Sequence, residues 1–163
     1  MEILTALRDA IAGHQNMLRK GILHRDVSIN NIVIGKYRDK SKVGTRGILI
    51  DLDMAIWTDR MESVLGKDFR TGTRAYQSGN ILHSYSEPFK CRPHSHLDDL
   101  ESFFYVLCWI CFSYLGVRNL KLPGTSPILE DWDDEDPNRA WRAKKSFYYE
   151  SPPVLLQPTH SRA

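Results

Sequence analysis

The sequence predicts a mainly helical α+β fold with one short β-hairpin and a buried central helix. In residues 2–19, apolar side chains recur every three or four positions, which predicts an amphipathic helix. Short apolar segments at 32–34 and 47–50 flank a polar connector and predict the hairpin. Residues 103–117 are apolar on every side, which predicts a helix that is buried all round.

The helix predicted for residues 2–19 has favourable end signals. Arg19 and Lys20 complement the negative end of the helix dipole, and Gly21 can take the left-handed conformation that ends a helix. His14 lies in the apolar stripe, so we interpret it as a packed core histidine rather than as a ligand. Ile22 and Leu23 then form a short extended lead into the next motif.

Two stretches place oxygen-bearing side chains in an order that suits phosphoryl transfer. The segment His24-Arg25-Asp26-Val27-Ser28-Ile29-Asn30-Asn31 ends where the first hairpin strand begins, and Ile50-Asp51-Leu52-Asp53 closes the second. The hairpin should therefore make Asn31 and Asp51 neighbours. Asp26 could accept a hydroxyl proton, while Asn31 and Asp51 could hold magnesium on phosphates. The alternative interpretation, that these residues only cap loops, requires the whole pattern to arise by accident.

The rest of the chain gives weaker signals. Residues 54–80 show no clear periodicity, and 83–96 look loop-like. The latter hold His83, Cys91, His94 and His96, but no Cys-x-x-Cys pair accompanies them, which disfavours zinc. The apolar run of 103–117 is too short for a membrane span, and its Cys108 and Cys111 are expected in the core. Asp136 and Pro137 predict the start of a helix that ends near Tyr149.

Size and composition set the broad class. The chain has 163 residues, enough for one domain with a substantial core, and 42% hydrophobic and 26% charged residues are ordinary for a globular protein. A net charge of +2 indicates neither nucleic acid nor a membrane as a partner. Three cysteines and no signal-peptide pattern predict an intracellular protein, cytoplasmic or nuclear.

These motifs together resemble the C-terminal lobe of a eukaryotic-type protein kinase, and most closely that of fungal-type protein kinases. His24-Arg25-Asp26 matches the catalytic loop, and Asp51-Leu52-Asp53 stands where Asp-Phe-Gly is usual. Gly72-Thr73-Arg74-Ala75-Tyr76 resembles the end of an activation loop, and Asp98-Asp99-Leu100-Glu101-Ser102 the start of the central helix. The resemblance implies a partial kinase lobe at 1–150. Residues 151–163 contain three prolines and no pattern, which predicts a disordered tail.

The resemblance also implies roles, with ATP and Mg²⁺ as cofactors and a protein as substrate. Asp26 would be the catalytic base within a loop that includes His24, Arg25 and Ser28, and Asn31 and Asp51 would bind the metal and nucleotide. Arg25 would receive a phosphate placed on Ser63, Thr71 or Thr73. Asp99 would hold the catalytic loop rigid through hydrogen bonds to its backbone.

Several features depart from the family pattern. The chain begins at the helix before the catalytic loop, so the N-terminal lobe, with its Gly-rich loop and phosphate-positioning lysine, is expected to be absent. Ser28 replaces a lysine that would face the transferring phosphate. Asp53 replaces a glycine, and Ser78-Gly79-Asn80 replaces Ala-Pro-Glu, with loss of the usual buried glutamate pair.

Three functions fit these observations. The first is a protein serine/threonine kinase, truncated in this chain and with little turnover alone. The second is a small-molecule phosphotransferase of the aminoglycoside or choline kinase type, which the pattern at Ile50–Asp53 also fits. Arg25, the Gly72-Thr73 segment and residues 98–102 favour the first. The third is a non-catalytic pseudokinase module that binds a partner through its exposed surface.

Overall fold

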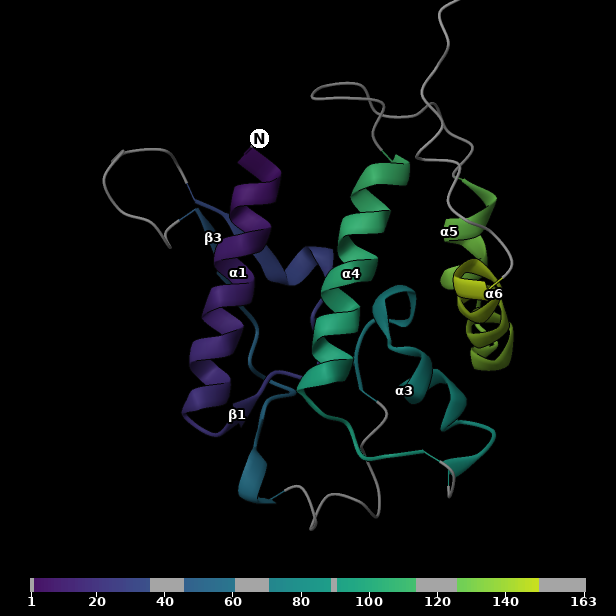
Figure 1. The fold of residues 1–163 in the computed structure, drawn as a ribbon, viewed down its shortest axis with the longest axis horizontal. Coiled ribbons are helices and arrows are strands. Elements are labelled where there is room, and N and C mark those ends of the chain that lie inside the picture. The colour runs from purple at the N-terminus through teal and green to yellow at the C-terminus, as the bar shows by residue number, and fades with distance from the viewer. Residues whose placement is uncertain (1, 36–45, 61–70, 89–90, 114–125, 150–163) are drawn as a thin grey trace, which may run out of the picture.

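The computed structural model describes residues 2–35, 46–60, 71–88, 91–113 and 126–149. In this part of the chain the fold is mainly helical, with two small sheets, as the α+β prediction requires. Helices α1 (Glu2–Arg19) and α4 (His96–Ser113) lie side by side and run in opposite directions (Figure 1). Helices α5 (Pro127–Trp132) and α6 (Pro137–Tyr149) lie across α4 from α1, and the short α3 (Gly79–His83) lies nearer the start of α4 (Figure 1).

The described strands form two antiparallel pairs. Strand β1 (Ile22–Leu23) pairs with β4 (Ile56–Trp57), and β2 (Ile32–Ile34) pairs with β3 (Gly47–Leu49). The second pair is the predicted hairpin, and its strands agree with the prediction to within one residue. The pairing of β1 with β4 was not predicted, because two-residue strands leave no alternating pattern to detect.

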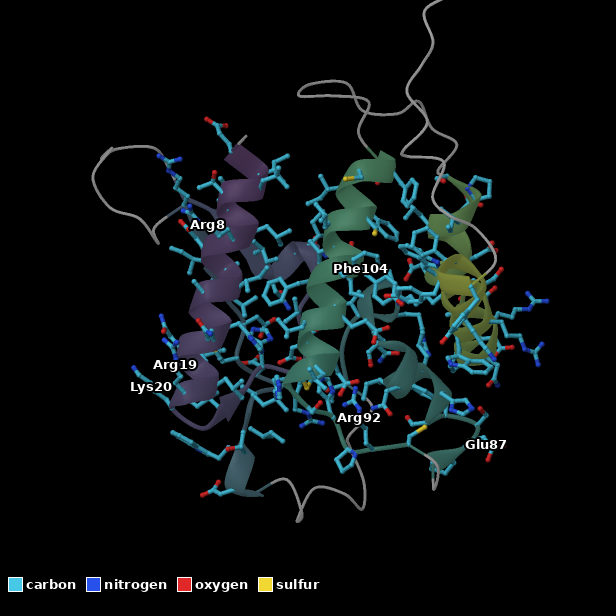
Figure 2. The ribbon with its side chains drawn as sticks, viewed as in Figure 1. Arg8, Arg19, Lys20, Glu87, Arg92 and Phe104 are labelled. Carbon is cyan, nitrogen blue, oxygen red and sulfur yellow. The ribbon has the colours of Figure 1, made fainter. Side chains whose placement is uncertain are left out.

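The predicted ends of two helices are confirmed. Helix α1 ends at Arg19, and Arg19 and Lys20 lie at its C-terminal end (Figure 2). Helix α6 begins at Pro137, and the Asp136 side chain accepts a hydrogen bond of 2.9 Å from the backbone N–H of Asn138, as an N-cap should. The predicted hairpin connector and the predicted tail at 151–163 lie almost wholly outside the described residues.

Three predictions of local structure are wrong. The described part of the run 103–117 is not buried all round, because Phe104 and Cys111 on α4 are exposed. Cys111 is therefore not a core residue, although Cys108 is. Helix α5 was not predicted, and helix α3 and strand β4 lie at least partly in the stretch 54–80, for which no regular structure was predicted. Each of these elements is six residues or shorter, so tertiary packing and not sequence period determines it.

The hairpin packs directly onto the backbone of α1. A Cβ atom at Gly47 would lie 1.7 Å from the carbonyl oxygen of Ala6, so only glycine fits there. One residue earlier, the backbone N–H of Arg46 donates to Asp9 Oδ2 at 3.1 Å, and Asp9 is buried in α1. This attachment holds the connector end of the hairpin on α1, and Asn31 and Asp51 lie at the opposite end, before β2 and after β3.

The core lies on both sides of α4. Small and aliphatic side chains such as Leu7 and Ala10 pack on the α1 side together with Phe103, whose ring meets His14 edge-on, and several aromatic rings pack around Trp132 on the α5 and α6 side. The buried Trp132 meets Tyr105 and Phe147 edge-on, with ring centroids 5.0 and 5.2 Å apart. Within the described residues, no helix has both the length and the apolar character needed to cross a membrane.

Candidate active site

The backbone of the His24-Arg25 segment is held by one carboxylate at the start of α4. The backbone N–H of His24 donates to Asp99 Oδ2 at 3.2 Å, and that of Arg25 donates to Oδ1 at 3.1 Å. Asp99 is fully buried. Arg25 has φ of 71°, in the left-handed region that a residue with a long side chain rarely adopts. The bonds to Asp99 therefore stabilise a strained backbone immediately before Asp26.

Two histidines complete the surroundings of Asp99. His14 Nε2 of α1 lies 2.8 Å from Oδ2, and His94 Nε2 lies 2.9 Å from Oδ1. Burial alone would raise the pKa of Asp99, but hydrogen bonds from His14 and His94 and attraction to their rings hold that pKa well below its ordinary value. His14 is a core histidine, as predicted, and it also anchors the carboxylate that supports the loop.

Asp26, the predicted base, is partly exposed and held on both oxygens. Oδ1 accepts the backbone N–H of Thr73 at 3.0 Å and its hydroxyl at 3.3 Å. Oδ2 accepts the side-chain amide of Asn31 at 3.2 Å, and the same amide donates to the backbone oxygen of Asp26 at 2.9 Å. Because the NH₂ group of Asn31 is directed to Asp26, its amide oxygen is the atom that could serve a cation.

The structure brings the segment of Asp51 next to that of Asn31. The backbone N–H of Ile50 donates to the backbone oxygen of Asn31 at 2.9 Å. Asp51 itself is exposed and has φ of 67°, and its Oδ1 lies 3.4 Å from the backbone nitrogen of Asp53. A carboxylate and an amide oxygen on adjoining segments are the hard oxygen donors that Mg²⁺ prefers.

His24 links the two segments through its ring. Its Nδ1 lies 3.3 Å from the backbone nitrogen of Asp26 and its Nε2 lies 3.0 Å from the carbonyl oxygen of Ile50. A backbone N–H can only donate, so Nδ1 is the acceptor and Nε2 carries the proton. The neutral ring therefore ties the Asp26 loop to the residue before Asp51.

The other predicted site residues lie inside the fold. Arg25 and Ser28 are buried, with 5% and 1% of their surface exposed. Of the three hydroxyls proposed as phosphate acceptors, Thr71 donates to the backbone oxygen of Arg25 at 3.2 Å and Thr73 donates to Asp26. Ser63 lies outside the described residues. Thr71 thus contacts the backbone of Arg25, and Thr73 contacts the neighbouring residue, Asp26.

Residues 71–77 form a compact turn over Asp26. The Gln77 side chain donates to the backbone oxygens of Thr71 and Gly72, both at 3.0 Å, and so closes the turn. Gly72 has φ of 100°, and a Cβ there would approach the backbone oxygen of Arg25 to 3.2 Å. Glycine is required here because the chain passes this close to the Asp26 loop in a left-handed conformation.

Sequence reasoning missed the role of Asp98, the other buried carboxylate at the start of α4. Asp98 accepts the Ser78 hydroxyl at 2.6 Å and the Arg92 guanidinium at 2.5 Å, and Figure 2 shows Arg92 beside this end of α4. Both aspartates are fully buried. The available signal was a second acidic residue directly before Asp99, and we had assigned a role beyond the helix start only to Asp99, whose predicted bonds to the loop backbone the structure shows.

The described part of the chain holds no cluster that could bind zinc. Cys91 Sγ lies 3.5 Å from His83 Nδ1, but His94 is bonded to Asp99, and no group of three potential ligands occurs among the described residues.

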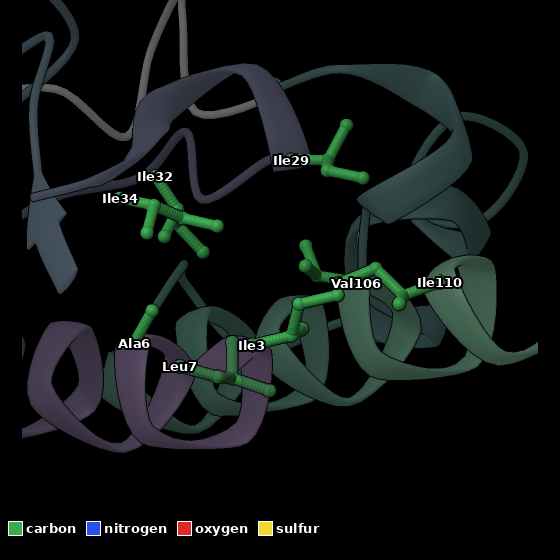
Figure 3. Close-up of a pocket in the computed structure, with 8 residues that line it drawn as sticks. All are labelled: Ile3, Ala6, Leu7, Ile29, Ile32, Ile34, Val106 and Ile110. Atoms are coloured by element: carbon green, nitrogen blue, oxygen red, sulfur yellow. The ribbon is translucent and has the colours of Figure 1, made fainter. Parts of the chain in front are cut away.

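A separate pocket of about 240 Å³ lies between α1, α4 and the hairpin (Figure 3). Its lining is aliphatic and consists of Ile3, Ala6, Leu7, Ile29, Ile32, Ile34, Val106 and Ile110. Without a polar side chain in that lining, it offers no group for proton transfer or for cation binding. The candidate chemistry therefore lies at Asp26, Asn31 and Asp51.

Comparison with known protein families identifies a match. The family model described as fungal protein kinase matches residues 1–111, which include Asp26, Asn31, Asp51, Gly72–Thr73 and Asp98–Asp99. None of the curated proteins matches the chain. Residues 112–163, with α5 and α6, lie outside the matched region.

Proposed function

The chain belongs to the fungal protein kinase family, and we propose that it forms the catalytic lobe of an ATP-dependent protein serine/threonine kinase. In this proposal residues 1–150 are the lobe, Asp26 is the base, and Asn31 and Asp51 bind the Mg²⁺ of ATP. The observation that carries it is the position of Asp26, fixed by Asn31 on one oxygen and by Thr73 on the other.

In the proposed reaction, the residues of the chain orient the acceptor and receive its proton. Asp26 is partly exposed, so an acceptor hydroxyl can approach its carboxylate, and the bonds from Asn31 and Thr73 keep that carboxylate from rotating. Mg²⁺ bound to ATP would neutralise charge on the transferred phosphoryl group. Oxygen atoms of Asn31 and Asp51 suit that cation.

Two observations bear on the kind of acceptor. The turn at 71–77 reaches Asp26 through Thr73, so an acceptor would meet both the base and this turn. The turn presents backbone and a hydroxyl rather than a cluster of acidic groups, which amino-alcohol or aminoglycoside acceptors would require. These observations favour a protein hydroxyl over a cationic small molecule.

An exposed apolar face supports the view that this lobe packs against another lobe or another protein. Five apolar side chains of the hairpin and the residues that follow it are exposed by 40–51%, namely Val33, Ile48, Ile50, Leu52 and Met54. We propose that the nucleotide base and the second lobe typical of such kinases cover this face. The same face would serve a partner protein if the chain were a pseudokinase.

Phosphate transfer tests the proposal directly. A version of the protein that includes the second lobe is incubated with labelled ATP, Mg²⁺ and a generic protein substrate, because the chain alone should give little turnover. Incorporation is compared with that of Asp26→Asn. We expect the substitution to lower transfer by a factor of about 10²–10⁴, the usual contribution of a general base. Asp53→Asn is the control, since it removes a neighbouring charge without removing the base or a proposed ligand.

Two results would contradict the proposal. Equal incorporation by wild type and Asp26→Asn would remove Asp26 from the chemistry, and faster transfer to amino alcohols than to protein would favour the small-molecule phosphotransferase. The cation arm uses Asp51→Asn, which should raise the Mg²⁺ concentration needed for half-maximal transfer.

A further inference from the structure

Lys144 of α6 is a buried cation bonded to the turn that contacts Asp26. Only 1% of its surface is exposed, and its Nζ donates to the backbone oxygens of Ala75 at 2.9 Å and Gln77 at 2.7 Å. The same Nζ lies 3.7 Å from the centre of the Tyr105 ring. An ammonium group is costly to bury without partners. Both of these hydrogen bonds go to one short segment, residues 75–77, and the Tyr105 ring of α4 adds a cation–π contact.

That segment leads to Asp26 by a short series of contacts. Gln77, whose carbonyl binds Lys144, uses its side chain to hold the carbonyls of Thr71 and Gly72. Thr73, the next residue, donates to Asp26. The backbone N–H of Gln77 also donates to the carbonyl of Thr73 at 3.1 Å. Lys144 is therefore connected to Asp26 through hydrogen bonds and the backbone of residues 71–77.

Other charged groups around Lys144 do not replace this role. On α4, Glu101 accepts the backbone N–H of Gly79 and the Tyr105 hydroxyl, both at 2.9 Å. Burial lowers the pKa of Lys144 to about 7, with the charge of Arg74 acting in the same direction and Glu101 and Asp133 opposing it. The ammonium is therefore bound mainly by the two carbonyls, and it titrates in an accessible range.

We propose that Lys144 is a positioning residue, which sets the place of Thr73 against Asp26 from the far side of the turn. It touches neither substrate nor nucleotide. Its effect on phosphate transfer rests on the proposed function, but its effect on Thr73 does not. Lys144 also lies outside residues 1–111, so the family match itself assigns it nothing.

Amide hydrogen exchange measured by NMR on the whole chain tests this. Lys144→Met should speed exchange of the Thr73 amide at least tenfold while leaving amides of α1 and of the middle of α4 close to wild type. Lys145→Met is the matched control. It removes the same charge from the next residue of α6, whose Nζ lies 5.0 Å from the Trp141 ring.

A second measurement needs no substitution and remains informative if Lys144→Met fails to fold. In the wild-type chain, the Thr73 amide shift and the Lys144 side-chain signal are followed through pH 5–9, together with the histidine and tyrosine signals, including those of Tyr105 and Tyr148. We expect Thr73 to titrate with the midpoint of Lys144.

Three results would overturn the proposal: exchange that rises equally in all helices, Thr73 exchange unchanged in a folded Lys144→Met, or a Thr73 titration that follows a histidine. Where transfer is measurable, Lys144→Met should lower kcat and leave the KM for ATP unchanged. If Lys144→Met leaves Thr73 exchange unchanged while the wild type transfers phosphate, only the positioning role is refuted. If Lys144→Met speeds Thr73 exchange while the wild type transfers no phosphate, only the proposed function is refuted.

Discussion

The two carboxylates proposed for the reaction have contrasting surroundings. Asp26 accepts hydrogen bonds on both oxygens, and its loop is fixed by the buried Asp99. Asp51 is exposed. Among the described residues, its side chain makes one contact, 3.4 Å from Oδ1 to the backbone nitrogen of Asp53. The base side is thus set by folding alone, whereas the cation side would gain most of its order from a bound ligand.

The largest expected effect compares the residue that supports the Asp26 loop, Asp99, with the exposed Asp51. Asp99→Asn removes a buried charge that four described groups share, and should lower the free energy of unfolding by about 3–5 kcal/mol. Asp51→Asn should remain close to wild type, because the side chain is exposed and asparagine tolerates φ of 67°. Urea denaturation measures both. Similar losses in the two variants would contradict the comparison.

The next prediction tests whether the hairpin that precedes Asp51 is fixed on α1. Gly47→Ala places a methyl group against the Ala6 carbonyl and should cost about 1–3 kcal/mol by overpacking. Gly13→Ala in α1 is the control, since a Cβ there meets nothing within 4 Å and alanine favours a helix. Thermal unfolding should show opposite signs. A neutral Gly47→Ala would mean that β3 moves freely on α1.

Acid denaturation should sharpen the comparison further. The pKa of Asp99 is lowered in the folded chain, so its stabilising effect is fully present above its ordinary value of about 4 and is lost as pH falls below it. We expect part of the acid-induced loss of stability to come from this group. Stability curves from pH 6 to pH 2 for wild type and Asp99→Asn measure it, and parallel curves would exclude the effect.

The smallest effect concerns Lys144 on the far side of the turn. Its pKa is lowered to about 7, so from there up to about 10.5 the unfolded chain holds the proton more tightly, and stability should rise with pH. The gain should be about 1 kcal/mol between pH 7 and 8. Lys144→Met should lack this rise and Lys145→Met should retain it. A fall in wild-type stability over this range would reverse the assigned sign.

The sequence predicted those elements whose determining residues lie close together in the chain. The amphipathic stripe predicted α1, and the Asp136-Pro137 pair predicted the start of α6. The catalytic-loop motif identified Asp26 and Asn31, which the structure places in contact. In each case the determining residues lie within a few positions of one another in the chain.

The remaining features depend on contacts between distant residues. His14 meets Asp99 across 85 positions, and Lys144 meets Ala75 across 69. A single histidine in an apolar stripe, or a lysine in an amphipathic helix, carries no mark of such a partner. The short α3 and α5 were missed for a related reason, since helices of five and six residues are stabilised by packing rather than by propensity.

Asp98 and Asp99 fix the rotation of α4 about its own axis. Successive residues of a helix point about 100° apart, so the two carboxylates serve different segments, Asp98 the Ser78 and Arg92 groups and Asp99 the His24 loop. A turn of α4 by one residue would break both sets at once. Any partner that twisted α4 would therefore disturb the base and the turn over it together, although it touched neither.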